Sequence, residues 1–376
     1  MMVAMTAFTP SAMTALIDSP VHYDLAESTC PPLEVADLAD VGELADLALD
    51  YGTSRGDAEL RELIAAAAGV DAGQVLVTVG AIEAMFLLAQ ATCGPGDRVL
   101  LVTPCFPPAR TVPEGLGARV DAVPLSFDDG YRLALDAVAG ALTPRTRLVS
   151  LASPQNPSGV RFTGDELRGL LDVVRDRAPE AVVLVDETYH ASTYDDDRAP
   201  RSAAAMSPRI VTCSSLSKAH GAPGLRIGWL TTTDPGLYER LRQAKFHTTI
   251  ACSTVDEFLA AQVLRREPEI LAMRAKRLGR ALAELVNWAQ DQPVEIVRPD
   301  GGALCCLRLP AGRFPDDAAV AAFYTRLAKS DTRVAPGSWF GEHDRVFRLG
   351  FGHLPADDFS TALDRLADAL TPVNRR

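Results

Sequence analysis

The sequence has little that would place the protein in a membrane or on nucleic acid. No Lys or Arg precedes Arg55, so the apolar N-terminus lacks the positive charge of a secretory signal, and we interpret it as an arm of the folded protein. No apolar run approaches the length needed to span a bilayer. The formal net charge is -12 and no run of Lys or Arg is present, which argues against nucleic acid as a partner. Small molecules are therefore the expected ligands.

Paired cysteines are also absent. The seven cysteines are scattered, with Cys305 and Cys306 adjacent and no C-x-x-C pair, so neither a disulfide framework nor a zinc site is indicated. We interpret all seven as reduced thiols. The sequence therefore predicts a cytoplasmic location and no bound metal.

The chain does contain ample apolar material, since 47% of its 376 residues are hydrophobic and 23% are charged, and this length is enough for about two domains. Over roughly residues 50–245, short runs rich in Val and Leu alternate with helical patterns such as residues 57–68, which Asp57 can cap. This alternation is typical of an α/β fold with a parallel sheet covered by helices. The expected strands are residues 75–79, 98–102, 147–152, 181–186, 209–214 and 228–232.

A different pattern begins near residue 251. A long helical stretch over residues 257–290 precedes two strand-like segments, 301–309 and 345–351, and a final amphipathic helix over 355–370. We interpret this part as a smaller α+β domain. The expected division is an N-terminal arm that contributes to the small domain (1–49), a large domain (50–250), and a linking helix with the small domain (251–376).

Four motifs lie where predicted strands end, which is where open α/β sheets bind ligands. Gly80 in TVGAIEAM opens a helix, so the amides of Ala81 and Ile82 could bind a phosphate, or the glycine could serve only a tight turn. Asn156 in SPQNPSG, taken alone, indicates a loop. Asp186 in LVDETY ends a buried strand, where a carboxylate either needs a cation nearby or caps the segment that follows.

The fourth motif, SSLSKAHGAPGLRIGW, places Lys218 among small residues and ahead of Arg226. A lysine amine has an ordinary pKa of about 10.4, so it becomes a nucleophile only where its surroundings make the neutral form accessible. With Y-G-x-x-x-G-x-x-x-L-R from Tyr51 to Arg61, N-P-x-G and D-E-x-Y, this motif resembles the aspartate aminotransferase superfamily. These fold type I enzymes use pyridoxal phosphate. The resemblance runs from Tyr51 to Gly352 and implies a class I or II aminotransferase that forms a homodimer.

The resemblance also implies a role for each site residue, and its catalytic residues are Lys218, Asp186 and Tyr189. It implies that Lys218 forms a Schiff base with the cofactor and then moves the proton at the substrate α-carbon, while Asp186 keeps the pyridine nitrogen protonated. It assigns Tyr189 and Asn156 to the ring hydroxyl and Phe106 to the ring face, although Phe106 could equally pack in the core. The residues matched to the cofactor phosphate are Gly80, Ala81, Ile82, Ser215, Arg226 and the partner subunit's Tyr51. Those matched to the substrate carboxylate are Arg348 and Asn156.

One segment departs from the family pattern. Where many members have a glycine over the substrate, this chain reads YDLAESTCPPLEV, and its Asp24 and Glu27 could face solvent or meet a cationic substrate side chain. The chain is also similar to capreomycidine-synthase-like enzymes, which process arginine derivatives without net transamination. We therefore expect transfer of an amino group between an α-amino acid and a 2-oxo acid. The alternative is a cyclase, an oxidase or hydroxylase, or an eliminating enzyme that acts on a basic amino acid such as an arginine derivative.

A third class of function is a non-catalytic module that binds an effector, as in some DNA-binding regulators. That reading requires an additional basic helix-turn-helix domain, and the arm before Tyr51 has no Lys or Arg. The sequence therefore favours an enzyme of amino acid metabolism.

Overall fold

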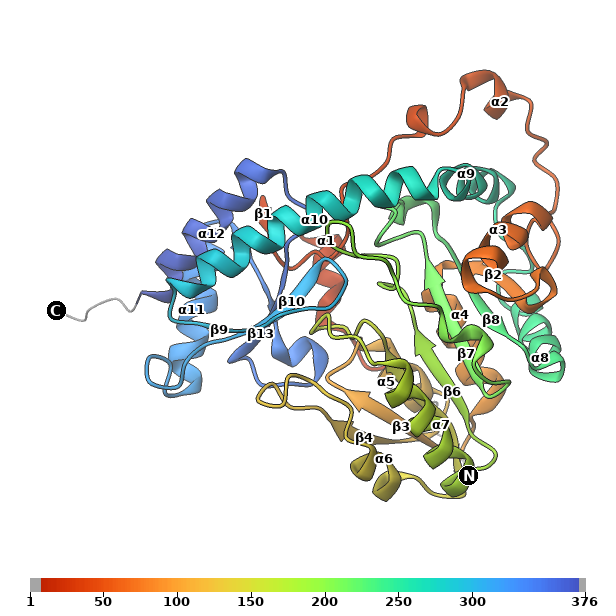
Figure 1. Cartoon of the computed structure of the whole chain (residues 1–376), viewed down its shortest axis with the longest axis horizontal. Helices are drawn as coiled ribbons and strands as arrows, with labels where there is room; N and C mark the ends of the chain where they lie inside the picture. Colours follow the sequence, from red (N-terminus) through yellow and green to blue (C-terminus); the bar gives the residue numbers. More distant parts are fainter. Residues whose placement is uncertain (1–7, 372–376) are drawn as a thin grey trace.

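A seven-stranded sheet forms the centre of the larger domain in this computed structural model, which describes residues 8–371 (Figure 1). The strand order is β2-β8-β7-β6-β5-β3-β4, and all neighbours are parallel except that β8 is antiparallel to β2 and to β7. The predicted α/β class with a mostly parallel sheet is therefore confirmed. The strands are β2 (Val75–Val79), β3 (Arg98–Thr103), β4 (Arg119–Pro124), β5 (Thr146–Ala152), β6 (Val182–Asp186), β7 (Ile210–Ser215) and β8 (Ile227–Thr232).

Strand β4 is the one member of this sheet that the sequence does not predict. It lies at the sheet edge, pairs only with β3 and buries only Val123, so it lacks the apolar run that identifies the other strands. Both ends of the other six strands agree with the prediction to within one residue.

Both faces of the large sheet are covered by helices. Successive residues of a strand point to opposite faces, and accordingly Leu148 and Leu184 pack in one apolar cluster whereas Val149 and Val183 pack in another. The first cluster includes side chains of α4 and α8, and the second includes side chains of α6 and α7. The helices of this region are α4 (Gly80–Thr92), α5 (Pro108–Gly115), α6 (Leu135–Ala141), α7 (Gly164–Arg177) and α8 (Pro235–Phe246).

Helices α3 (Ala58–Ala68) and α9 (Thr254–Arg265) pack together beside β2, and the long α10 (Glu267–Gln290) then runs from the large domain to the small one (Figure 1). Asp57 caps α3 as expected, since its side chain accepts from the Leu60 amide. The helical stretch expected from residue 257 is divided at Arg266. Pro268 lies in the first turn of α10, where its missing N–H is tolerated.

The small domain is built on a four-stranded antiparallel sheet of order β12-β13-β10-β9. Helices α11 and α12 pack on one another and on this domain's core. The elements are β9 (Glu295–Val297), β10 (Leu304–Arg308), α11 (Asp317–Lys329), β11 (Thr332–Arg333), β12 (Ala335–Pro336), β13 (Val346–Gly350) and α12 (Ala356–Leu370).

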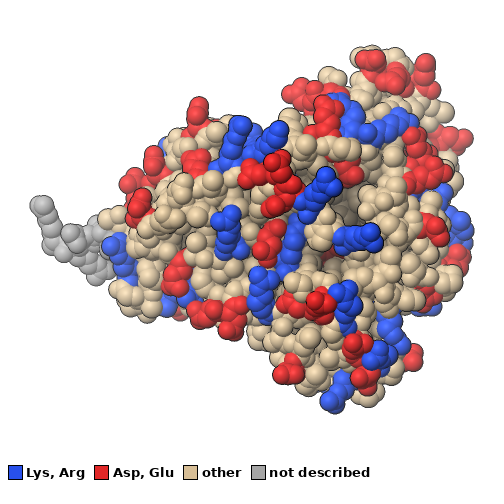
Figure 2. Space-filling model, viewed as in Figure 1, with Lys and Arg blue, Asp and Glu red and all other residues tan. Residues whose placement is uncertain are grey.

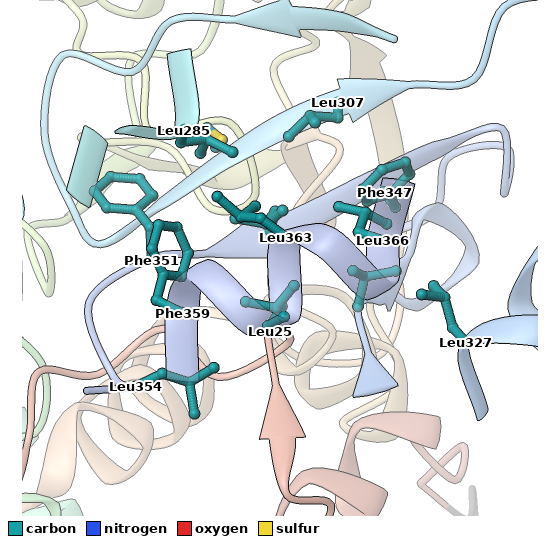
Figure 3. Packing of buried hydrophobic residues seen from close by; sticks show 14 of the residues in the cluster. Leu25, Leu285, Leu307, Leu327, Phe347, Phe351, Leu354, Phe359, Leu363 and Leu366 are labelled. Carbon is teal, nitrogen blue, oxygen red and sulfur yellow. The ribbon is translucent and has the colours of Figure 1, made fainter. Parts of the chain in front are cut away.

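The N-terminal arm reaches the small domain. Its strand β1 (Tyr23–Asp24) pairs in parallel with β11, and the next residue, Leu25, is fully buried. Figure 3 shows Leu25 beside α12, in a cluster that also includes Leu363 and Phe351. The first seven residues of the expected arm, and the last five of the expected C-terminal domain, lie outside the described part of the chain.

The remaining helices are short and connect these larger elements. Two are α-helical, α1 (Ala15–Asp18) and α2 (Val41–Ala45). The 3-10 helices are Ala12–Thr14, Val35–Asp37, Ala72–Gln74, Ala203–Ala205, Pro223–Leu225 and Gly337–Phe340.

Among residues 8–371, none of the helices is both long enough and apolar enough to cross a membrane. In the same residues, no group of three or more His, Cys, Asp or Glu side chains could hold a metal ion.

Candidate active site

The candidate site lies at the carboxyl edge of the large sheet. Asn156 follows β5, Asp186 is the last residue of β6, and Ser215 is the last residue of β7, with Lys218 in the turn beyond. These three strands are parallel neighbours, so their carboxyl ends meet at one edge. The parallel strands thereby bring together four predicted residues that are spread over more than sixty positions of the sequence.

The amine of Lys218 lies in a polar cluster made by three segments. Its Nζ is 3.4 Å from Glu27 Oε1 and 3.2 Å from Ser28 Oγ. Ser28 Oγ in turn lies 2.8 Å from the hydroxyl of the buried Tyr189. The arm is fixed against the lysine by its backbone as well, since the Cys30 amide donates to the Lys218 carbonyl at 3.3 Å. The lysine is therefore held between the arm and the end of the large sheet.

Glu27 is the acidic member of this cluster. Burial disfavours its charged form, but the Lys218 ammonium, the Ser28 amide, Arg348 and His353 outweigh burial and lower its pKa to about 2. Its side chain is 23% exposed, so the ion pair with Lys218 is largely shielded from water. Glu27 thus remains ionised throughout the physiological range.

Asp186 is in the opposite situation. Burial raises its pKa, and hydrogen bonds from the amide and hydroxyl of Thr188, at 2.9 and 2.5 Å, oppose that rise. Within residues 8–371, no Lys or Arg forms an ion pair with this carboxyl group. A buried carboxylate of this kind would be stabilised by a cationic ligand.

The start of α4, which follows β2 at the same edge of the sheet, is a candidate anion site. Helix α4 begins at Gly80, at φ +70°, without a side-chain cap, so the amides of its first turn are available to an anion. The Arg226 guanidinium lies against Gly80, where a Cβ would be 2.5 Å from its Nη2. A Cβ on Gly228 would be 2.4 Å from the Ala81 nitrogen, so only glycine allows the strand to approach this turn. Ser215 is buried at the end of β7, next to β8.

Arg348 brings the small domain into the site. This residue of β13 is only 1% exposed, and its Nη1 donates to Asn156 Oδ1 at 2.8 Å while its Nη2 donates to the Ala26 carbonyl at 2.6 Å. Its guanidinium lies 4.8 Å from the ring centroid of Phe340. The buried Nε has no hydrogen-bond partner within residues 8–371. A buried cation with a free donor can bind a carboxylate.

The two predicted aromatic residues are placed differently. Phe106 lines a small cavity with Asn156 and Asp186, and it also packs against the core beneath α4. Tyr51 is 84% exposed and, within residues 8–371, forms no hydrogen bond, ion pair or ring contact with the other predicted residues. Ile82 is 37% exposed at the start of α4.

The sequence did not single out Ser28, Thr188 or the Ala26 carbonyl. Thr188 lies within the D-E-T-Y motif, so its spacing from Asp186 was a usable signal. Ser28 and Ala26 had none, because their partners are 161 and 322 positions away.

Neither Asp24 nor Glu27 faces solvent freely, which corrects one of the two expected alternatives. Asp24 forms a buried ion pair with Arg333, whose Nε lies 3.2 Å from Asp24 Oδ1 and whose Nη2 contacts Oδ2. Its carboxylate is therefore already neutralised. Glu27 alone is turned toward Lys218.

The fold and the chemistry of these groups define an enzyme of the pyridoxal-phosphate type. The chain belongs to the aminotransferase class I and II family, whose sequence profile matches residues 22–366. It is thus a fold type I aminotransferase that uses pyridoxal phosphate, as the resemblance implied.

Three known proteins illustrate the similarity. The arginine–pyruvate transaminase of Pseudomonas aeruginosa is 31% identical over 309 residues, which cover 77% of this chain and 75% of that protein. Capreomycidine synthase of Streptomyces vinaceus is 29% identical and covers 96% of this chain and 90% of its own length. The crystal structure of a pyridoxal-phosphate-dependent cyclase superposes with a TM-score of 0.85 at 27% identity, over 98% of this chain and 99% of that one.

Proposed function

We propose that Lys218 attaches the cofactor covalently through Nζ and later carries the proton at the substrate α-carbon. The observation that supports this role is its position, because Lys218 lies at the sheet edge between Tyr189 and the arm, with its amine held but not buried in the core. Pyridoxal phosphate, when bound, supplies an electron-withdrawing ring that stabilises negative charge on the substrate α-carbon.

The surrounding residues fit such a cofactor. Asp186, a buried carboxylate without a cationic partner in residues 8–371, suits a protonated ring nitrogen. The first-turn amides of α4, together with Arg226 and Ser215, suit a phosphate. Tyr189 and Asn156 would bind the ring hydroxyl, and Phe106 would cover a ring face.

Arg348 would bind the substrate α-carboxylate. Its Nε is the unsatisfied donor, and Asn156 holds the guanidinium in place from the large domain. Because an amino acid and a 2-oxo acid share this carboxylate, one site serves both halves of the transfer.

Glu27 points to a cationic substrate side chain. Its ion-pair partner in this structure is the Lys218 ammonium, and its Oε1 also accepts hydrogen bonds from the Ser28 and Thr29 amides, at 2.7 and 2.9 Å. When the Lys218 amine is bound to the cofactor, a cationic substrate side chain would take its place beside this largely buried carboxylate. We infer that the amino donor has a basic side chain of the arginine type, in agreement with the arginine–pyruvate transaminase relative.

The test compares arginine with citrulline, which has nearly the same shape but a neutral end group. For the wild-type enzyme we expect kcat/KM with arginine to exceed that with citrulline by about 100-fold, as suits a largely buried ion pair. In Glu27→Gln the ratio should fall to about threefold or less. An unchanged ratio in this variant, with both substrates active, would refute the assignment of Glu27.

A cyclase that acts on a similar substrate is the second candidate, because capreomycidine synthase and the structurally similar cyclase match nearly the whole chain. The two reactions differ in their need for an acceptor. Without a 2-oxo acid, an aminotransferase should release one equivalent of oxo acid per site and then stop. Continued turnover without an acceptor would identify the second candidate.

We also propose that the enzyme is a cytoplasmic homodimer with shared sites. The exposed Tyr51 supports this proposal. The family resemblance assigns this tyrosine to the cofactor phosphate of the partner subunit, and in the single chain its side chain is left in solvent. The free state of all seven cysteines agrees with a reducing compartment. If the sites are shared, mixing unfolded Lys218→Ala and Tyr51→Ala chains and refolding them should restore about a quarter of the wild-type activity. If the refolded mixture is no more active than the two variants refolded separately, shared sites are excluded.

A further inference from the structure

A second cavity, of about 450 Å³, lies between α10 and the segment that leads into α12. Its apolar wall comes from Phe351, Leu354 and Phe359, and none of the residues proposed to bind cofactor or substrate lines it. A cavity of this volume is in the ordinary range for small-molecule sites.

The polar wall of this cavity is strongly basic. Arg274, Lys276, Arg277 and Arg280 all lie on α10 and all line the cavity. Figure 2 shows Lys and Arg side chains, with acidic side chains beside them, where α10 crosses the upper half of the molecule. The one carboxylate that lines the cavity in the described residues is Glu284, and it already accepts a hydrogen bond from Ser360 at 2.5 Å.

The basic side chains are incompletely paired. The side chains of Lys276 and Arg280 form no ion pair or hydrogen bond with any residue from 8 to 371. Among the same residues, the Arg277 side chain donates only to the Leu354 carbonyl, at 2.5 Å. Four positive charges thus converge on one cavity that holds a single, occupied carboxylate, although the whole chain has a formal charge of -12.

Arg274 is the most informative member of the group because it is 93% buried, with a relative exposure of 7%. Its Nη2 donates to the Pro31 carbonyl at 2.7 Å, and its buried Nε has no partner within residues 8–371. A buried guanidinium with an unmade hydrogen bond is expensive unless a ligand supplies the acceptor.

We propose that this cavity binds a small multivalent anion, a phosphate ester or a polycarboxylate, at a site separate from the one that holds Lys218. The arginines would bind its oxygens, and the apolar wall would accept its carbon skeleton. Because Arg274 also holds Pro31, next to Cys30, whose amide binds the Lys218 carbonyl, the bound anion would stabilise the attachment of the arm.

The test uses the cofactor-loaded enzyme, so that the phosphate site at α4 is already filled. Inorganic pyrophosphate and citrate are titrated by calorimetry at an ionic strength held constant with sodium chloride. Wild type is compared with Lys276→Gln/Arg280→Gln and with the control Arg240→Gln/Lys329→Gln, which removes two exposed, unpaired cations elsewhere. All four side chains are exposed, so we expect both variants to fold.

We expect wild type and the control to bind at least one probe with one equivalent per chain and with a higher melting temperature when the probe is present. The Lys276/Arg280 variant should bind it about tenfold more weakly, since two of four attractive charges are gone. Equal affinity in that variant would place the anion elsewhere, for example at Arg348, and would overturn the proposal. The absence of binding by both probes to wild type would overturn it as well.

Discussion

The two sides of the active site are built in different ways. On the cofactor side, Asn156, Asp186 and Lys218 come from the ends of neighbouring strands in one regular sheet. On the substrate side, Glu27 and Arg348 come from the arm and the small domain, and they meet their partners across 191 and 192 positions of sequence. In the proposed function, the regular sheet therefore supplies the residues for the chemistry, whereas the residues that select the substrate come from segments outside the sheet.

The electrostatics of the two sides differ in the same sense. Asp186 has a raised pKa and no cationic partner in residues 8–371, whereas Glu27 has a pKa lowered to about 2 and is paired with Lys218. Two carboxylates on either side of one lysine are thus driven apart in pKa by their surroundings. In the proposed function, Asp186 gains a cationic partner when the cofactor binds, whereas Glu27 exchanges the Lys218 amine for the side chain of the substrate.

The largest expected effect is on the cofactor side. Replacing Asp186 with Ala removes the group that would keep the ring nitrogen protonated, so exchange of the substrate α-proton for deuterium should slow by about 10³-fold or more. Nuclear magnetic resonance of the amino acid in deuterated buffer measures this rate. Asp121→Ala, which removes a carboxylate paired with Arg98 on the same sheet, is the control and should exchange at nearly the wild-type rate. Wild-type exchange in Asp186→Ala would remove the carboxylate from the mechanism.

On the substrate side, Arg348→Lys should lower kcat/KM by about 100-fold, mainly through a higher KM. Lysine keeps the charge but cannot reproduce the planar pair of donors that binds a carboxylate and Asn156 together. Steady-state kinetics with the amino acid and with the oxo acid should show the same loss. Arg308→Lys, on the neighbouring strand β10, serves as the matched control. A loss confined to one of the two substrates would contradict a shared carboxylate site.

Asp24 separates structure from substrate choice within the arm. Asp24→Asn should lower the free energy of unfolding by about 2 kcal/mol, because it weakens a largely buried ion pair with Arg333. At temperatures where it is folded, its kcat/KM should stay within about threefold of wild type. Urea unfolding gives the first quantity, with the exposed Asp18→Asn as control. A substrate-dependent change in activity without a loss of stability would assign Asp24 to recognition instead.

The smallest effect concerns pH. The pKa of Glu27 is lower in the folded protein than the usual 4.5, so its contribution to stability is complete above pH 4.5 and is lost as the pH falls toward 2. In cofactor-free enzyme, the difference in unfolding free energy between wild type and Glu27→Gln should shrink by about 1 kcal/mol from about pH 5.5 to about pH 3.5. Urea titrations at several pH values measure it. A difference that grows toward acid would mean that the carboxyl group is not paired with Lys218.

The extent of prediction follows the same division. Strands β5, β6 and β7 are mostly buried apolar runs, and the motifs at their ends have fixed spacing. The sequence therefore indicates both the sheet and Lys218, Asp186 and Asn156. Strand β4 carries no such run, since it buries only Val123. Local pattern is enough where the chain folds back on itself within a few tens of residues.

Long-range contacts could not be predicted in this way. The pairing of Asp24 with Arg333 and the contact of Ser28 with Tyr189 depend on how separate segments pack, and no spacing in the sequence records that. The sequence offered Asp24 and Glu27 the same two alternatives, solvent or a cationic substrate. In the folded protein Asp24 instead pairs with Arg333, and Glu27 pairs with Lys218. The role proposed for Tyr51 involves a second subunit, and within a single chain its side chain is exposed.

The pairing of β1 with β11 has a consequence for biosynthesis. Tyr23 is made early but pairs with Thr332, 309 positions later, whereas the large sheet has all its strands once Thr232 is available. During translation the large domain can therefore fold while Leu25 still lacks the core that α12 completes. The arm is thus synthesised before the large domain but is among the last segments to reach its place in the folded protein.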